Sequence, residues 1–100
     1  MQIIRVIINV KEESWSAFEE IAKHEFEQVP QRFDGCAKFA YWRSLVNSTE
    51  VLLYQEWEST EAFKAYRESD YFKELGGKLF PLLGGKPDAA YYEGTVVGDG

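Results

Sequence analysis

The sequence contains few of the residues that build metal sites, disulfides or nucleophilic catalytic centres. Its 100 residues include one cysteine, Cys36, and one histidine, His24. A single cysteine excludes an intrachain disulfide and a metal site built from several thiolates. Because Cys36 follows a glycine and has no second cysteine to pair with, we interpret it as a small buried residue rather than a nucleophile. We therefore predict no metal site.

Basic residues are also in the minority. Lys and Arg number 11 against 17 Asp and Glu, which gives a formal net charge of −6. Phosphate binding requires concentrated positive charge, so we predict that the protein does not bind nucleic acid. The apolar N-terminal stretch MQIIRVIINV is too short and wrongly flanked for a signal peptide or a membrane span. We expect a soluble cytoplasmic protein that does not contact the membrane.

Apolar and aromatic residues, by contrast, are plentiful. Hydrophobic residues make up 45% of the chain and aromatic residues 16%. This composition and length predict one domain over residues 1–100 with one core, ending in a frayed Gly-rich tail over 97–100. The high aromatic content indicates that some apolar surface is buried against a partner or a ligand.

Residues 2–10 are apolar and β-branched almost throughout, which predicts a strand buried on both faces. Arg5 and Asn9 share one of these faces. A polar residue on an apolar surface requires a partner, a water molecule or a ligand. For Arg5, an ion pair with Glu56 or Glu93 is the structural alternative to a role in binding.

Apolar residues then recur at every third or fourth position, which predicts an amphipathic helix of about four turns. Ser14 or Ser16 is its cap, since Ser16 and Glu19 have the spacing of a capping box. Pro30 is expected to end the helix. The apolar stripe comprises Trp15, Phe18, Ala22, Phe26 and Val29.

Turn and cap signals divide the rest of the chain. Asp34-Gly35 and Asn47-Ser48 are turn sequences, and Ser59 and Ser69 can each cap a helix. We expect strands over 36–45 and 51–58, helices over 59–67 and 69–80, and a last strand over 86–97.

The resulting order of elements predicts an α+β, ferredoxin-like βαββαβ fold. It has a four-stranded antiparallel sheet with the helices on one face. The first three strands are apolar on both faces, so the helix-free face must be covered by something else. A second copy packing sheet against sheet is the simplest solution. We therefore predict a homodimer formed through the helix-free sheet face.

A combination of short motifs resembles one known family. Gly35-Cys36 precedes the second strand, and QEWES (55–59) leads into EAF (61–63) and SDYF (69–72). Together they resemble the antibiotic biosynthesis monooxygenase domain family, and the similarity in element order and length extends over nearly the whole chain. The resemblance implies a dimeric α+β barrel, in which each chain's pocket lies between its sheet and its helices.

Two subfamilies can be compared residue by residue. Cofactor-free anthrone monooxygenases have a pocket Trp, an Asn four residues earlier and a Tyr six residues later; here these positions are Trp57, Leu53 and Phe63. Haem-degrading members use a Trp nine residues after the Trp57 position and a His ten residues beyond it. Those positions are Tyr66 and Gly76, so no axial His is available for haem. The resemblance therefore implies no bound cofactor.

The function implied by the resemblance is a cofactor-independent monooxygenase acting on a small apolar aromatic or quinol-like metabolite. Such a reaction needs a water-poor cavity and a donor or base beside the oxygen that loses its proton. Two alternatives stay open. One is a non-catalytic ligand-binding or stress-related dimeric module, and the other is an isomerase-type member of the family.

Tyr66 and Arg5 are the predicted catalytic residues. Arg5 could stabilise an anion, and Tyr66 could transfer a proton if its pKa were lowered. The structural alternative for Tyr66 is a hydroxyl that reaches solvent, and for Trp57 it is simple core packing. The residues predicted to contact the substrate are Trp57, Asn9, Tyr41, Gln55, Phe63 and Leu53.

Overall fold

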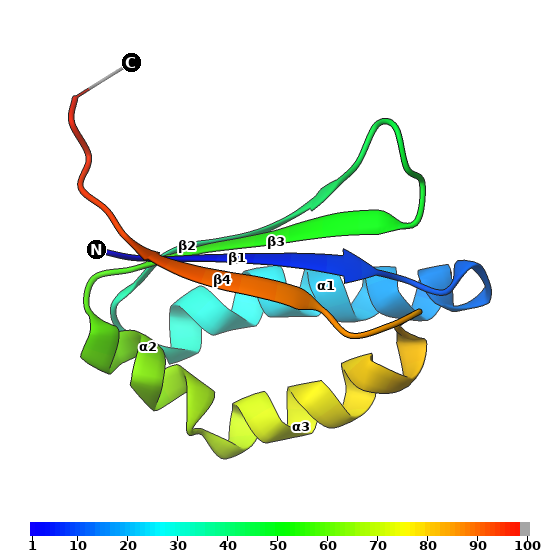
Figure 1. The fold of residues 1–100 in the computed structure, drawn as a ribbon. Helices are drawn as coiled ribbons and strands as arrows, with labels where there is room; N and C mark the ends of the chain where they lie inside the picture. Colours follow the sequence, from blue (N-terminus) through cyan, green and yellow to red (C-terminus); the bar gives the residue numbers. More distant parts are fainter. Residues whose placement is uncertain (99–100) are drawn as a thin grey trace.

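A computed structural model describes residues 1–98, which form one four-stranded sheet with the helices on one side (Figure 1). Of the predicted tail, Val97 and Gly98 lie outside regular secondary structure, and positions 99–100 are outside the described residues. The strands are β1 (Gln2–Asn9), β2 (Cys36–Arg43), β3 (Glu50–Trp57) and β4 (Asp88–Glu93); the helices are α1 (Trp15–Arg32), α2 (Thr60–Arg67) and α3 (Asp70–Leu79), with short 3-10 turns at Glu12–Ser14 and Phe80–Leu82.

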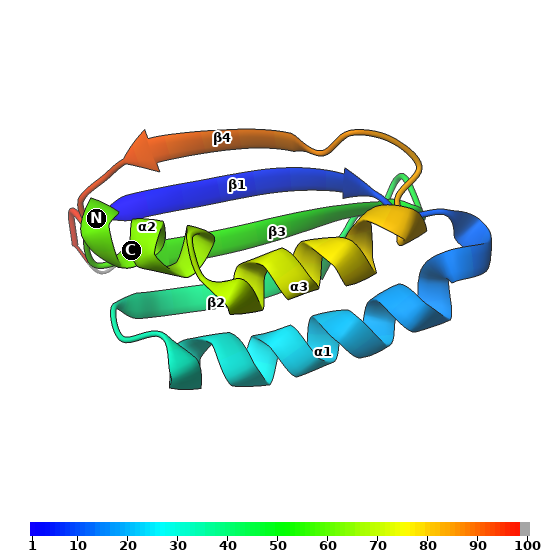
Figure 2. The same ribbon diagram turned by 90° about the horizontal axis from the view of Figure 1, so that it is seen from below.

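The strand order is β2-β3-β1-β4, and every neighbouring pair is antiparallel. Figure 2 shows the sheet from the helical side. Helix α1 runs along β2, while α2 and α3 lie over the two middle strands, β3 and β1. The predicted α+β ferredoxin-like fold is therefore confirmed.

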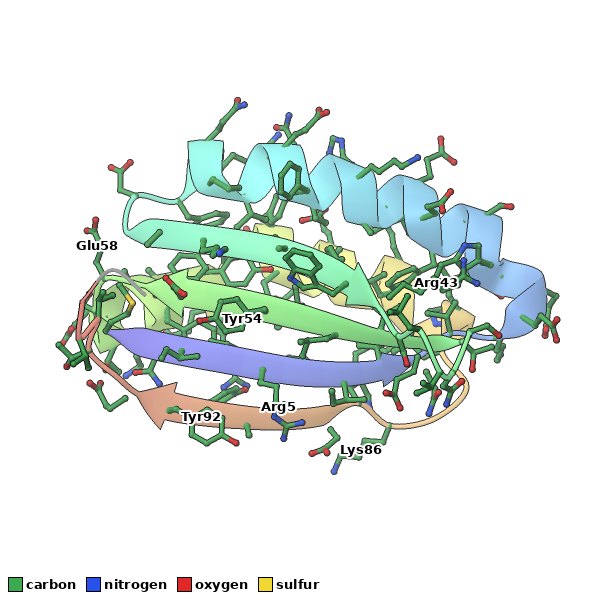
Figure 3. All side chains as sticks on the ribbon, turned by 90° about the horizontal axis from the view of Figure 1, so that it is seen from above. Arg5, Arg43, Tyr54, Glu58, Lys86 and Tyr92 are labelled. Carbon is green, nitrogen blue, oxygen red and sulfur yellow. The ribbon has the colours of Figure 1, made fainter. Side chains whose placement is uncertain are left out.

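Side chains alternate between the two faces of the sheet, and the helices cover only one of them. On β3, Val51, Leu53, Gln55 and Trp57 are buried, while the residues between them are partly exposed. Figure 3 looks onto the opposite face. We call it the helix-free face; the strand register places on it Ile3, Arg5, Ile7, Ala40, Trp42, Leu52, Tyr54, Ala90 and Tyr92.

The predicted caps of α2 and α3 and the predicted turn at Gly35 are confirmed. The Ser59 hydroxyl accepts a hydrogen bond from the Ala62 amide at 3.1 Å, and the Ser69 hydroxyl accepts one from the Phe72 amide at 3.1 Å. Gly35 has φ of +89°, a left-handed conformation that favours glycine. A Cβ at this position would also lie 2.7 Å from the Cβ of Ala62.

Helix α1 differs from its prediction at both ends. It continues through Pro30 to Arg32, because a proline in the last turn removes a single helical hydrogen bond. The Phe33 amide still closes the helix by donating to the Val29 carbonyl at 3.0 Å. At the start, a 3-10 turn makes Ser14 the N-cap, without a side-chain hydrogen bond, so the predicted capping box at Ser16 does not cap the helix.

The buried stripe of α1 also differs by one residue. The buried positions are Phe18, Ala22, Glu25 and Val29, a strict alternation of four- and three-residue steps. Phe26, which the sequence placed on the stripe, is 58% exposed. The reason is geometric, since Glu25 and Phe26 are neighbours along the helix and only one of them can point at the sheet.

The last strand is shorter than predicted. Strand β4 pairs only with β1, from Asp88 opposite Ile7 to Glu93 opposite Gln2. Because β4 is an edge strand, its length is limited by that one ladder. The residues before and after it, 86–87 and 94–97, lack regular structure.

Candidate functional site

A cavity of about 310 Å³ lies between the covered face of the sheet and helices α2 and α3. This volume is at the lower end of the range for small-molecule pockets. Its walls are mainly apolar side chains of the sheet and of α3. They include Ile4, Val6, Ile8, Leu53, Phe72 and Leu75.

The structure brings five of the predicted site residues together in this cavity. They come from β2, β3 and α2, which are far apart in the sequence. The five are Tyr41, Leu53, Gln55, Phe63 and Tyr66. The sheet register accounts for the three strand residues, because Tyr41 pairs with Leu53 and Gln55 lies between Ile4 and Phe39 on the covered face.

Trp57 lies behind the cavity rather than in its wall. Its side chain is fully buried, and its ring stacks on that of Tyr66 with 5.1 Å between centroids. The Trp57 indole N–H donates to the Gln55 side-chain oxygen at 2.8 Å. Trp57 therefore contacts the cavity-lining residues Gln55, Phe63 and Tyr66 without lining the cavity itself.

Arg5 and Asn9 are on the helix-free face, away from the cavity. Arg5 forms an ion pair with Asp88 at 3.7 Å (Figure 3). The predicted partners of Arg5 are engaged elsewhere. Glu56 accepts a hydrogen bond from Tyr54, and Glu93 pairs with the N-terminal amine. The alternation along β1 correctly predicted that Arg5 and Asn9 share a face. The helices pack on the other face of the sheet, so both residues are separated from the cavity.

Tyr66 is enclosed by aromatic rings and does not reach solvent, since only 1% of its surface is exposed. The rings of Phe33, Phe39 and Phe72 lie edge-on to it at 5.0–6.4 Å. Burial raises the pKa of Tyr66, and nearby Tyr41 and Glu25 raise it further. A base would need the opposite shift, so Tyr66 is a neutral hydroxyl that can donate a hydrogen bond.

A buried carboxylate lies close to these tyrosines. Glu25 is 4% exposed, and its Oε2 accepts a hydrogen bond from the Tyr71 hydroxyl at 2.6 Å. The pKa of Tyr71 is raised by burial and by this hydrogen bond, and that of Tyr41 by burial and by the charge of Glu25. Within residues 1–98, the buried Tyr41 hydroxyl has no hydrogen-bond partner.

The sequence did not indicate the roles of Glu25 and Arg67. Glu25 comes one residue before Phe26, which was expected on the apolar stripe. The three-residue step from Ala22 to Glu25 is the signal that could have identified Glu25 as a buried position. Arg67 lines the cavity at the end of α2. Its guanidinium lies 5.3 Å from the centre of the Tyr91 ring and 5.9 Å from that of Phe63.

A second hollow, of about 390 Å³, lies between α1 and β2. Trp15, Phe26 and Trp42 contribute to its walls, and the Arg43 guanidinium sits 3.8 Å above the Trp15 ring. Tyr41 lines both hollows. The second hollow contains none of the other predicted site residues.

Residues 1–98 contain neither a candidate metal site nor a helix that could span a membrane. No group of three or more His, Cys, Asp or Glu residues in this range is placed to hold a metal ion. In the same range, every helix is too short or too polar to span a bilayer.

The family to which the chain belongs follows from comparison with known proteins. The family model for antibiotic biosynthesis monooxygenase matches residues 1–76. The chain belongs to this family. The predicted membership is therefore confirmed, and the cavity of this family member lies between its sheet and its helices, where the resemblance placed it. A search of the curated proteins finds no significant match.

Several solved structures share the fold of this family member. A Nitrosomonas europaea protein named for the same family is 21% identical, with a TM-score of 0.86 over 96% of this chain and 100% of its own. A Caulobacter crescentus CB15 protein, also named for the family, is 21% identical, with a TM-score of 0.89 over 95% and 90%. A conserved protein from Methanosarcina mazei Go1 is 25% identical, with a TM-score of 0.83 over 95% of each chain.

Proposed function

We propose that the protein is a cofactor-independent monooxygenase acting on a small apolar aromatic or quinol-like metabolite, bound in the cavity between the sheet and α2–α3. The observation that carries this proposal is the cavity itself, an apolar space of about 310 Å³ with few polar groups. Family membership supports the reaction class. The substrate class rests on the aromatic walls, since flat rings pack well against Phe and Tyr side chains.

The proposed chemistry asks little of the protein beyond binding and proton control. In monooxygenation of an activated ring carbon, one atom of O₂ becomes a carbonyl oxygen and the other leaves as water with the two hydrogens of that carbon. The substrate itself supplies all four electrons that reduce O₂, and it reacts with O₂ as an enolate or phenolate. Apolar walls exclude water, and the neutral Tyr66 hydroxyl can donate a hydrogen bond to the substrate oxygen.

Oxygen uptake tests the proposal directly. We expect consumption of O₂ with at least one member of a panel of hydroquinones and anthrones, above the rate of autoxidation. Tyr66→Phe removes only the hydroxyl, so it should lower the rate by roughly ten- to a thousandfold. Ser16→Ala, which removes a hydroxyl from the exposed side of α1, should leave the rate unchanged. Turnover by Tyr66→Phe at the parent rate would rule out a catalytic role for Tyr66.

Two alternatives make different predictions in the same assay. A non-catalytic ligand-binding or stress-related module would bind members of the panel without oxygen uptake. An isomerase-type member would convert small carbonyl metabolites without consuming oxygen. The raised pKa of Tyr66 counts against chemistry that needs a tyrosinate base in the cavity.

The proposal includes a homodimer and a cytoplasmic location. A second copy would pack on the helix-free face, where Trp42 and Tyr92 are 58% and 51% exposed and Ile3, Ile7 and Leu52 are only partly covered. In this arrangement Arg5 and Asn9 would lie at the interface between the copies. Exposed aromatic and aliphatic side chains over one sheet face are typical of a surface that binds a partner.

A further inference from the structure

Gln55 is a polar side chain in the middle of an apolar sheet face. It lies on β3 between Ile4 of β1 and Phe39 of β2, and it is 3% exposed. It also lines the cavity. A buried amide costs free energy unless its hydrogen-bonding groups are satisfied, so this position needs a physical reason.

Trp57 determines which way the Gln55 amide points. An indole N–H can only donate, so the atom it meets at 2.8 Å must be the Gln55 oxygen. The amide nitrogen is then at the other end of the group, with two N–H donors. Within residues 1–98, the hydrogen bond from Trp57 is the one found for the Gln55 side chain. The two donors are therefore free for a molecule in the cavity.

The orienting indole is itself held firmly. Trp57 has no exposed surface, and its ring packs on Tyr66 at 5.1 Å and on Phe63 at 5.9 Å. Tight packing on both rings leaves little room for the indole to rotate. The fixed indole in turn holds the Gln55 amide in place, so this amide needs little reorganisation when it meets a ligand.

We propose that the Gln55 amide donates a hydrogen bond to an acceptor oxygen on a ring-shaped ligand, and that Trp57 is the positioning residue that aims it. The acceptor is a carbonyl oxygen or the oxygen of a deprotonated enol or phenol. This inference rests on the proposed function, because it names the ligand chemistry of the same cavity. An amide N–H₂ in apolar surroundings selects for such an oxygen, since a ligand without one leaves the donor unpaired.

A matched pair of ligands isolates this contact. The probes are 2-acetylnaphthalene and 2-ethylnaphthalene, which have the same ring system and chain length and differ by a carbonyl in place of a methylene. We expect titration of the wild-type protein to give about 2- to 12-fold tighter binding of the acetyl compound, the effect of one buried hydrogen bond. The readout is the ratio of the two dissociation constants.

Two variants assign this ratio to residues. Gln55→Met removes both donors at similar size, and we expect the ratio to fall to one or below, because the ligand carbonyl is then buried without this donor. Trp57→Phe keeps a ring but leaves the amide free to turn, so the ratio should also fall. A purely structural effect of Trp57→Phe would change both affinities alike and leave the ratio intact. Trp15→Phe, which makes the same change in the other hollow, is the matched control with an unchanged ratio.

A measurement on the wild-type protein keeps the test decisive if Gln55→Met does not fold. The Gln55 side-chain amide protons should shift in nuclear magnetic resonance spectra with 2-acetylnaphthalene and move less with 2-ethylnaphthalene. Equal affinities together with equal shifts would overturn the inference while leaving the cavity as a ligand site. Binding of neither compound would overturn the inference and the proposed ligand site together. A ratio that survives Trp57→Phe would overturn the positioning role.

Discussion

Glu25 and the tyrosines around it show how one charged residue sets the chemistry of a small core. The carboxylate is nearly fully buried, and within residues 1–98 its hydrogen bond comes from Tyr71. Its negative charge acts on Tyr41, Tyr66 and Tyr71, raising the pKa of each beyond the effect of burial alone. Burial is the larger cause of each shift, and Tyr41 and Tyr66, which line the cavity, are therefore neutral phenols that can donate hydrogen bonds rather than remove protons.

The stability of the protein should respond differently to loss of the Tyr71 hydroxyl and of the Tyr41 hydroxyl. Tyr71→Phe leaves the buried Glu25 carboxylate without its donor, so we expect the free energy of unfolding to fall by roughly 1–3 kcal/mol. Tyr41→Phe removes a buried hydroxyl that has no partner within residues 1–98. Its stability should be unchanged or slightly higher. Urea unfolding of both variants checks this pair, and equal losses would contradict our account of the cluster.

Cys36 provides a test of pH dependence. Burial raises the pKa of its thiol to about 11, although a hydrogen bond with the Lys38 backbone opposes the shift. At pH 8 the reactive thiolate should be about a hundredfold scarcer in the folded protein than in the unfolded chain, whose thiol has a pKa of 9.0. Iodoacetamide should therefore react slowly with the native protein and quickly in urea. The native rate should keep rising up to about pH 11, and a plateau near pH 9 would contradict the shift.

The direction of the linked stability follows from the same shift. The folded state holds the Cys36 proton more tightly than the unfolded chain, so the stabilisation is complete below the unfolded pKa. It is lost as the pH rises towards the folded pKa of about 11. The tyrosines with raised pKa act in the same direction at still higher pH.

The connections between elements depend on a few positions where local sequence and tertiary contact agree. Gly35 leads from α1 into β2 with φ of +89°, and α2 packs so closely that Ala62 leaves no room for a side chain. Gly77, in the last turn of α3, faces open space, and a Cβ added there would meet no heavy atom within 4 Å among the described residues. The two glycines therefore serve different purposes: Gly35 is required by its turn and by the close approach of Ala62, whereas Gly77 is not required by any contact among the described residues.

Alanine substitutions at the two glycines should therefore have opposite signs. Gly35→Ala introduces a strained backbone and a steric clash, so we expect a loss of roughly 1–3 kcal/mol in the free energy of unfolding. Gly77→Ala should raise it by about 0.5–1 kcal/mol, because alanine is the better helix former. Thermal or urea unfolding of both variants measures the difference. A stabilising Gly35→Ala would show that the turn relaxes more easily than its geometry indicates.

Elements determined by local sequence were predicted well, and those that depend on packing were not. The caps at Ser59 and Ser69 and the turn at Gly35 carry their own chemistry, so they could be predicted. The end of α1 could not, because the buried Val29 and the hydrogen bond from Phe33 outweigh the helix-ending tendency of Pro30.

The candidate site was predicted in the same uneven way. Alternation along a strand reveals which residues share a face, but it does not reveal which face the helices cover. Leu53 and Gln55 are on the covered face and line the cavity, whereas Arg5 and Asn9 are on the other. Tertiary packing decides which polar residues line the cavity. The sequence does not reveal this for β1, because its two faces are almost equally apolar.

At the scale of the whole molecule, the helix-free face is bordered by two raised segments. The β2–β3 hairpin and the C-terminal segment both extend away from the helices, at opposite ends of the sheet (Figure 1). Both carry apolar, largely accessible side chains, with Leu45 and Val46 on the hairpin and Val96 and Val97 on the C-terminal segment. In a two-fold dimer these segments could pack on the partner's sheet. The symmetry repeats every contact, so the segments of each copy would cover the sheet of the other.

A charge in the middle of the helix-free face should separate the two copies of the proposed dimer. Leu52 lies opposite Ile7 and Trp42 on this face, so Leu52→Asp would bury an unpaired carboxylate in the interface. We expect the wild-type protein to sediment at twice the 11.6 kDa of one chain at micromolar concentration, and Leu52→Asp to sediment as a monomer. Ala17→Asp adds the same charge at an exposed position of α1, and it should leave the sedimentation unchanged. Circular dichroism of both variants separates dissociation from unfolding. A wild-type monomer would refute the dimer, and a folded, dimeric Leu52→Asp would place the contact on another surface.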